Sequence, residues 1–185
     1  MNISREEAQA SLAAIQQTRA KMDKLIGISG YFLIIWGLVW FCGCLSDQYL
    51  SIDYASWVWG IGVTIGWILS AIIGIYLGKQ THSRINSRIA FFFLALFSFA
   101  VLWFFVMQPA SFKQDALFVL TIFLFGGVVS GIMTRVLASI ISCLAIAVLV
   151  VLGYYLVPSY FFLWTAIFSG LAMFCIGLVM RLRWR

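Results

Sequence analysis

Long apolar blocks separated by short polar breaks occupy most of the chain, from residue 25 to residue 180. About 20 apolar residues in a helix cross the ~30 Å hydrocarbon core of a bilayer. The blocks therefore predict six membrane spans, at about 26–45, 57–78, 89–107, 116–134, 136–156 and 161–180. The first break lies at 46–48, and the weakest lies at Arg135, inside an apolar run too long for one span. We expect an all-α membrane protein, a six-helix bundle of three consecutive transmembrane hairpins.

The first 24 residues follow a different pattern, that of an amphipathic helix. Ser4 and Glu7 have the spacing of a capping box. Ala8, Leu12, Ile15, Met22 and Leu25 then lie three or four residues apart on one narrow face, with Thr18 filling the gap between Ile15 and Met22. We predict a cytoplasmic amphipathic helix at 1–24, followed by a transmembrane domain at 25–185. The helix either lies on the inner leaflet, contacts a partner or a second copy, or packs over the bundle's own loops.

Small residues occupy every fourth position of the second predicted span, at Gly62, Gly66, Ser70, Gly74 and Gly78. Because a helix turns once in about 3.6 residues, these positions form one nearly straight ridge. In lipid, small residues let two helix backbones approach closely, and this contact supplies much of the packing energy. We therefore predict a glycine zipper, a helix-packing ridge that places 57–78 at the centre of the bundle or at an oligomer contact.

Composition supports this class and excludes others. The chain is 64% hydrophobic and only 10% charged, whereas soluble domains are about 25% charged. The net charge of +6 does not indicate nucleic acid binding here, because the placement of the basic residues fits membrane orientation instead. The lipid bilayer is the expected environment, and no nucleic acid partner is expected.

Lysine and arginine set the orientation of short loops, with the excess on the cytoplasmic side. In the six-span arrangement, Lys113 alone lies on one side and eleven basic residues lie on the other: Arg5, Arg19, Lys21, Lys24, Lys79, Arg84, Arg88, Arg135, Arg181, Arg183 and Arg185. We therefore expect a multi-pass plasma (inner) membrane protein with both termini in the cytoplasm. Asp47, Asp53 and Asp115 then fall on the outer side.

Candidate chemistry is sparse. The six predicted spans contain no ionisable Asp, Glu, Lys, Arg or His, although such residues are the usual mark of a proton relay or ion site. The single histidine, His82, lies in the loop 79–88 with no acid beside it. The cysteines Cys42, Cys44, Cys143 and Cys175 lack further ligands nearby, so small apolar packing is their expected role. We predict no catalytic residue, no metal and no cofactor, and hence no enzyme.

Two functional hypotheses follow from different classes. The first is a non-enzymatic assembly, accessory or regulatory component, which assembles with itself or with a membrane or cytoplasmic partner through the ridge and the N-terminal helix. The alternative is a small transporter or channel for an uncharged or weakly polar solute. Phenylalanines surround the third span and predict a lipid-facing helix, while Trp36, Trp40 and Trp67 either pack or line a cavity.

Overall fold

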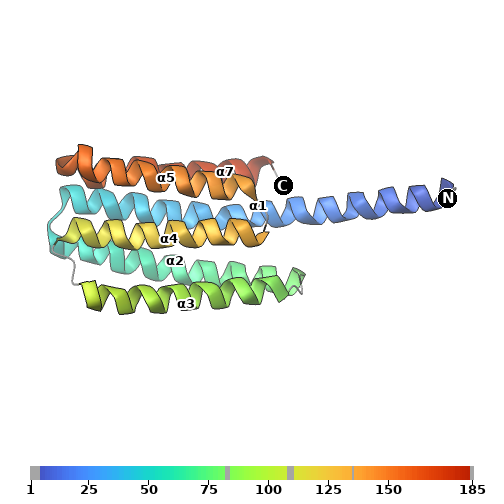
Figure 1. Ribbon diagram of the computed structural model, residues 1–185, viewed down its shortest axis with the longest axis horizontal. Coiled ribbons are helices and arrows are strands. Elements are labelled where there is room, and N and C mark those ends of the chain that lie inside the picture. The colour runs from blue at the N-terminus through green and yellow to red at the C-terminus, as the bar shows by residue number, and fades with distance from the viewer. Residues whose placement is uncertain (1–4, 82–83, 108–110, 135, 184–185) are drawn as a thin grey trace.

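The computed structural model describes residues 5–81, 84–107, 111–134 and 136–183, and these residues form helices with no strand. The first five helices are α1 (Arg5–Tyr49), α2 (Ile52–Thr81), α3 (Arg84–Met107), α4 (Phe112–Thr134) and α5 (Leu137–Leu156). The last segment joins a 3-10 turn η1 (Pro158–Tyr160), α6 (Phe161–Thr165), a π-helix η2 (Ala166–Leu171) and α7 (Ala172–Arg183). Successive helices run in alternating directions, side by side in one bundle (Figure 1).

Five helical segments among the described residues are long and apolar enough to cross a membrane: Gly30–Tyr49, Ile52–Tyr76, Phe112–Met133, Ser139–Leu156 and Pro158–Arg183. In α3 the apolar stretch is shorter and covers Phe91–Met107. This composition identifies a helical membrane protein. The apolar run around Arg135 is divided between α4, which ends at Thr134, and α5, which begins at Leu137; Arg135 itself lies outside the described residues. The amide of Val136 donates to the carbonyl of Gly131 over 2.9 Å.

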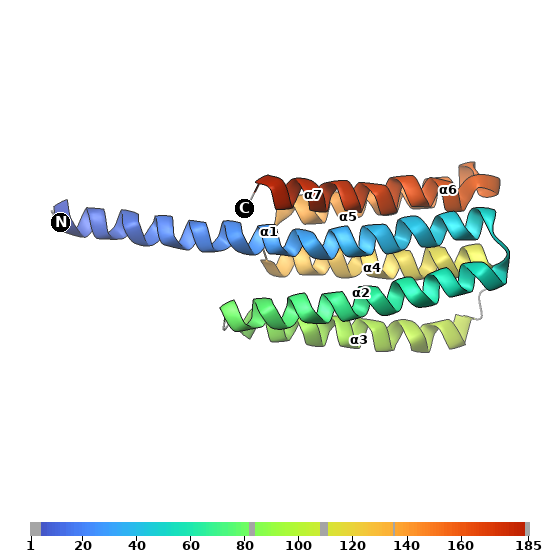
Figure 2. The same ribbon diagram turned by 180° about the vertical axis from the view of Figure 1, so that it is seen from behind.

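The N-terminal segment and the first span form a single helix. α1 continues without a break for 45 residues, and its first half projects beyond the bundle on the side where the chain also ends (Figures 1 and 2). Ser4, the expected helix cap, lies outside the described residues. Because the helix has no kink or loop at 24–25, the N-terminal part extends as a stalk in line with the first span.

The centre of the bundle is α1, not α2. α1 packs against α2, α6, η2 and α7. In the most apolar part of α2, by contrast, only 6% of the residues are buried. The buried side chains gather around the second half of α1 and the facing surfaces of α4, α5, α6 and η2: Trp40, Cys44, Leu120, Leu124, Ile146, Val150, Phe161, Phe162 and Ala166. Residues 57–78 therefore do not form the centre of the bundle, and an oligomer contact of this span stays a prediction.

The first polar break, at 46–48, does not end the helix as the sequence predicts. Residues 46–48 belong to α1, and the chain turns only at Leu50 and Ser51. Ser46 donates to the carbonyl of Gly43 over 2.7 Å, and the side chains of Asp47 and Gln48 bond to other helices. Because these polar groups have partners within the bundle, the helix continues through them.

Candidate functional site

The predicted ridge of α2 is divided between two environments. A methyl group at Gly66 would lie 3.4 Å from a methyl of Val39 in α1, and one at Gly62 would lie 3.6 Å from the same side chain. Ser70 accepts a hydrogen bond of 3.1 Å from the indole nitrogen of Trp36. A methyl group at Gly74, in contrast, would meet nothing within 4 Å among the described residues. The first half of the ridge thus receives α1 side chains and Gly74 faces outward, while the surroundings of Gly78 are not described.

The closest backbone contact lies elsewhere, between α1 and the last span. A methyl group at Gly37 would lie 2.5 Å from the amide nitrogen of Phe174 and 2.8 Å from the carbonyl oxygen of Gly170. Further along, a methyl at Gly30 would lie 2.7 Å from the carbonyl oxygen of Gly177, and the reverse distance is 2.6 Å. Four glycines therefore form an antiparallel contact, which we call the glycine seam (Gly30, Gly37, Gly170 and Gly177).

Sequence interpretation did not find this seam, although a signal was present. In each of the two helices the paired glycines are seven residues apart, a spacing that returns to the same face after two helical turns. The spacing of four in α2 is more conspicuous because it links five successive small residues. The seam cannot be recognised from α1 alone, because its partner helix, the last span, lies far away in the sequence.

The π-helix η2 forms part of the seam, and two buried hydroxyl groups lie here, on Thr165 at the end of α6 and on Ser169 of η2. π-helical segments are rare and are found mostly as single turns, often at functional sites. Thr165 and Ser169 are only 1% and 0% exposed. The hydroxyl of Thr165 has no hydrogen-bond partner among the described residues, and that of Ser169 has only the weakly accepting sulfur of Met173, 4.0 Å away.

A polar network joins the helices at the end of the bundle opposite the stalk. The indole nitrogen of Trp59 donates to Asp47 Oδ2 over 2.8 Å. Gln48 donates to the carbonyl of Ser159 over 3.2 Å and accepts from the amide of Leu163 over 3.4 Å. This network ties α1 to α2 and to the start of the last span. Sequence interpretation placed Asp47 in a loop, because its partner Trp59 is identifiable only in the folded chain.

Other polar groups lie in the same region, and only some of them form hydrogen bonds. Lys113 Nζ donates to the carbonyl of Pro158 over 2.6 Å. Oδ1 of Asp47 and Oδ1 of Asp115 are buried and have no hydrogen-bond partner among the described residues. Buried acceptors without a donor are costly, so a bound water molecule would stabilise each of these oxygens. The two acids come from different helices, and no described contact joins them.

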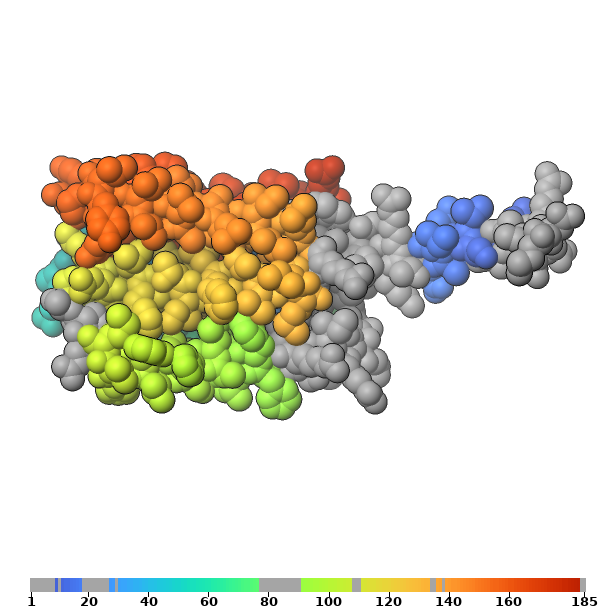
Figure 3. Space-filling model, in the orientation of Figure 1, coloured from blue at the N-terminus to red at the C-terminus, as the bar shows by residue number. Residues whose placement is uncertain are grey.

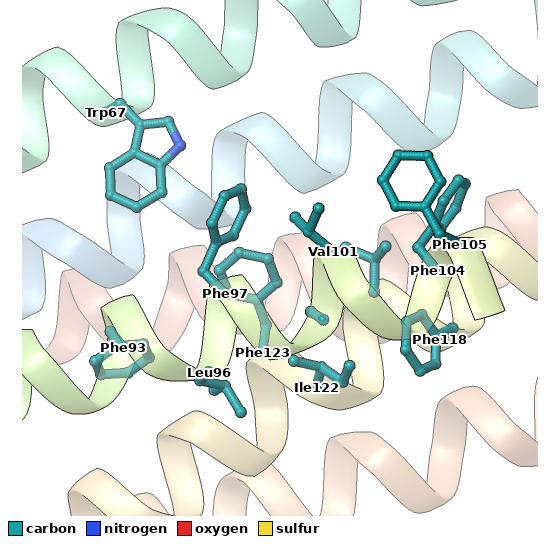
Figure 4. A pocket seen from close by; sticks show the side chains of 12 residues that line it. Trp67, Phe93, Leu96, Phe97, Val101, Phe104, Phe105, Phe118, Ile122 and Phe123 are labelled. Carbon is teal, nitrogen blue, oxygen red and sulfur yellow. The ribbon is translucent and has the colours of Figure 1, made fainter. Parts of the chain in front are cut away.

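An apolar groove of about 240 Å³ opens between α2, α3 and α4 (Figure 4). Apart from Trp67, its wall consists of aliphatic and phenyl side chains: Phe93, Leu96, Phe97, Ala100, Val101, Phe104, Phe105, Phe118, Val119, Ile122 and Phe123. Among the three deeper tryptophans, Trp67 therefore lines a groove. Trp36 packs between Trp67 and Phe123, with ring centroids 5.8 and 5.9 Å away, and Trp40 is buried in the core.

The described surface of the stalk is exposed. Gln9 and the whole segment 11–17 are exposed, and in Figure 3 this segment stands clear of the bundle. Leu12 and Ile15 of the apolar stripe are 59% and 63% exposed. The stalk therefore does not pack over the loops of its own bundle along this segment.

The other candidate residues form no visible chemical centre. Within the described part of the chain, no group of three or more His, Cys, Asp or Glu side chains lies close enough to hold a metal ion. All four cysteines are free thiols; Cys44 is buried, Cys143 is half-buried, and Cys42 and Cys175 are exposed. His82 lies outside the described residues. No protein-family model, curated protein or solved structure matches the chain.

Proposed function

We propose that this protein is a non-enzymatic assembly component of the membrane, which binds a second copy or another protein through its N-terminal stalk. The single observation that supports this function is the projection of α1 beyond the bundle with Leu12 and Ile15 exposed. Exposed apolar side chains at helical spacing are typical of helix pairing.

The geometry of the stalk favours a partner over the two other arrangements. From Arg5 to the first residue of the apolar span, Gly30, the helix rises by about 38 Å. A helix that continues the axis of a span cannot at the same time lie flat in the headgroup layer. The exposed segment 11–17 likewise does not fit packing on the bundle's own loops.

A helix of this length also benefits from a partner. Most helices in water owe their stability to the packing of an apolar face. The span supplies the stalk with a helix already nucleated, and Ala10, Ala13 and Ala14 favour its continuation. Leu12 and Ile15 nevertheless remain in water until a second surface covers them. Pairing with another helix would cover both.

The same proposal includes a topology. Six spans with both termini in the cytoplasm, in the plasma (inner) membrane, account for the eleven-to-one distribution of basic residues. α3 then supplies the sixth span, although its apolar stretch Phe91–Met107 is short. The alternation of helix directions, which brings the stalk and the C-terminal end to one side of the bundle, supports this assignment (Figure 1).

The outward half of the α2 ridge is the second proposed contact surface. Around Gly74, where a methyl group would meet nothing within 4 Å, Ile72 and Ile75 are 58% and 62% exposed. This small position flanked by large apolar residues fits close approach by another helix in lipid. A transporter remains the alternative function, but the groove described above supports it little because its wall is apolar.

The test compares the stalk stripe with the opposite face of the same helix. We expect Leu12→Gln combined with Ile15→Gln, or a chain that begins at Met22, to lose its partner or change its oligomeric state. Ala13→Gln, on the other face, is the matched control and should leave assembly unchanged. Cross-linking in native membranes and mass photometry after extraction measure the result.

Unchanged assembly of the stripe variant and of the shortened chain would contradict the proposal. If the purified protein in liposomes then passes a small neutral solute, the transporter hypothesis replaces it. If nothing passes, neither function is supported, and the stalk is only an extension of the fold.

A further inference from the structure

We propose that the groove between α2, α3 and α4 is a binding site for one acyl chain of a membrane phospholipid. The groove is bounded by Phe97 and Val101 of α3 on one side and by Phe118 and Phe123 of α4 on another, with Trp67 of α2 closing its inner end (Figure 4). This proposal is independent of the assembly function of the stalk.

The chemistry of the wall selects an uncharged hydrocarbon. No ionisable side chain is among its twelve lining residues, and the indole nitrogen of Trp67 is the sole side-chain nitrogen or oxygen in that set. A polar ligand would lose its hydrogen bonds to water there without replacement. The volume of about 240 Å³ exceeds the ~150 Å³ of an apolar cavity that holds benzene and is below the range of ~300–1,000 Å³ for drug-sized ligands.

The packing of α3 explains why the groove exists. Phe93 and Leu96 close onto α4 at Gly126, where an added methyl group would lie 2.8 and 2.9 Å from their side chains. Among the described residues, α3 packs more closely against α4 than against α2, which it meets through Phe97 and Trp67. α2 and α3 therefore diverge, and atoms that face a gap lose dispersion contacts. A chain in the groove restores those contacts.

The surroundings identify the source of the chain. The groove adjoins the outward face of α3, where Phe99, Leu102 and Phe105 are 62%, 56% and 74% exposed. In a membrane protein such a surface meets lipid, whose tails are as apolar as leucine. From Phe93 to Phe105 the wall extends about 18 Å along α3, close to the ~15 Å depth of one leaflet. The wall covers most of the apolar stretch Phe91–Met107 of α3, so the groove is long enough to hold one acyl chain along its length.

Photolabelling distinguishes a held chain from surrounding lipid. The full-length protein is reconstituted with a phospholipid that carries a diazirine within one acyl chain, extracted into detergent without lipid, washed and irradiated. We expect the retained adducts to map to the peptides that contain 97–105 and 118–123. Exposed positions such as Leu94 should lose their label with the bulk lipid.

Ala100→Trp fills the groove, because Ala100 is part of its wall. We expect this change to lower the retained adducts about tenfold, the change that 1.4 kcal/mol of lost binding produces. Ala95→Trp is the matched control, since Ala95 is exposed on the same helix and outside the wall. Ala100→Leu serves as a milder filler and should give a smaller decrease if the tryptophan variant does not fold.

Three results would overturn the proposal. The first is no retained adduct after extraction of the unaltered protein. The second is equal labelling of the groove in the filled variants and the Ala95→Trp control. The third is cross-linking of the groove to a second protein copy, which would make this face an interface between chains.

Discussion

Replacing Gly37 with alanine should destabilise the bundle, because Gly37 lies where α1 and the last span touch through their backbones. The added methyl group would lie 2.5 Å from the nitrogen and 2.9 Å from the Cα of Phe174. Carbon atoms pack favourably at about 3.5–4.0 Å, so the two helices must separate by about 1 Å. Neither side can yield by turning a side chain, since the opposing atoms belong to the backbone.

The magnitude follows from two opposing terms. Overpacking of this kind typically costs about 1–3 kcal/mol, and the upper end applies where backbones collide. Alanine in a helix interior regains about 1 kcal/mol relative to glycine, which leaves a net loss of about 2 kcal/mol. At about 2–4 °C per kcal/mol for a chain of this size, the melting temperature should fall by about 4–8 °C.

The matched control is Gly74→Ala in α2, where a methyl group meets nothing within 4 Å. Within a single chain only the helix-propensity term acts there, so the stability of the monomeric bundle should stay unchanged or rise by up to about 1 kcal/mol. Gly66→Ala is intermediate, with its methyl 3.4 Å from Val39. Tryptophan fluorescence during thermal unfolding in detergent measures all three variants. Equal melting temperatures for Gly37→Ala and Gly74→Ala would refute the reasoning from the glycine seam.

Three further predictions concern the ends and the interior of the bundle. Reporter fusions after Ser159 should read external and those after Asn86 and at the C-terminus cytoplasmic; an external C-terminus would reject the six-span topology. Trp59→Phe should lower the free energy of unfolding by about 1–3 kcal/mol because it leaves Asp47 without its donor, and chemical denaturation showing no loss would contradict that bond. Thr165→Val should be neutral or stabilising, since the hydroxyl has no partner among the described residues; a loss above about 1 kcal/mol would reveal one.

The helical class and most helix positions were predictable from the sequence because they depend on local properties. Apolar length alone locates α4 and α5, and the break at Arg135 follows from the limit that bilayer thickness sets. The continuation of α1 through Asp47 was not predictable, because it depends on contacts with Trp59 and with the start of the last span. An acid in a helical turn and an acid in a loop have the same local sequence.

The site was less predictable than the fold, because helix contacts depend on which helices meet. The ridge at Gly62, Gly66, Ser70, Gly74 and Gly78 is a genuine periodic feature of α2, and its role as a helix-packing ridge stays a prediction. Gly30 and Gly37 become noticeable only when Gly170 and Gly177 lie opposite them. The exposure of Leu12 and Ile15 also required the structure, since an amphipathic stripe fits a buried helix equally well.

The continuity of α1 gives the protein a mechanical property. The helix is a lever with arms of about 38 Å outside the apolar span and about 30 Å inside it. A sideways displacement of about 10 Å at the tip would tilt the axis by about 15°, and the inner arm would carry that rotation directly to Phe174 and Gly170. Force applied to the stalk is thereby delivered to the glycine seam, without any intervening joint. A Gly-Pro pair in place of Lys21 and Met22 would uncouple the two arms while leaving each intact.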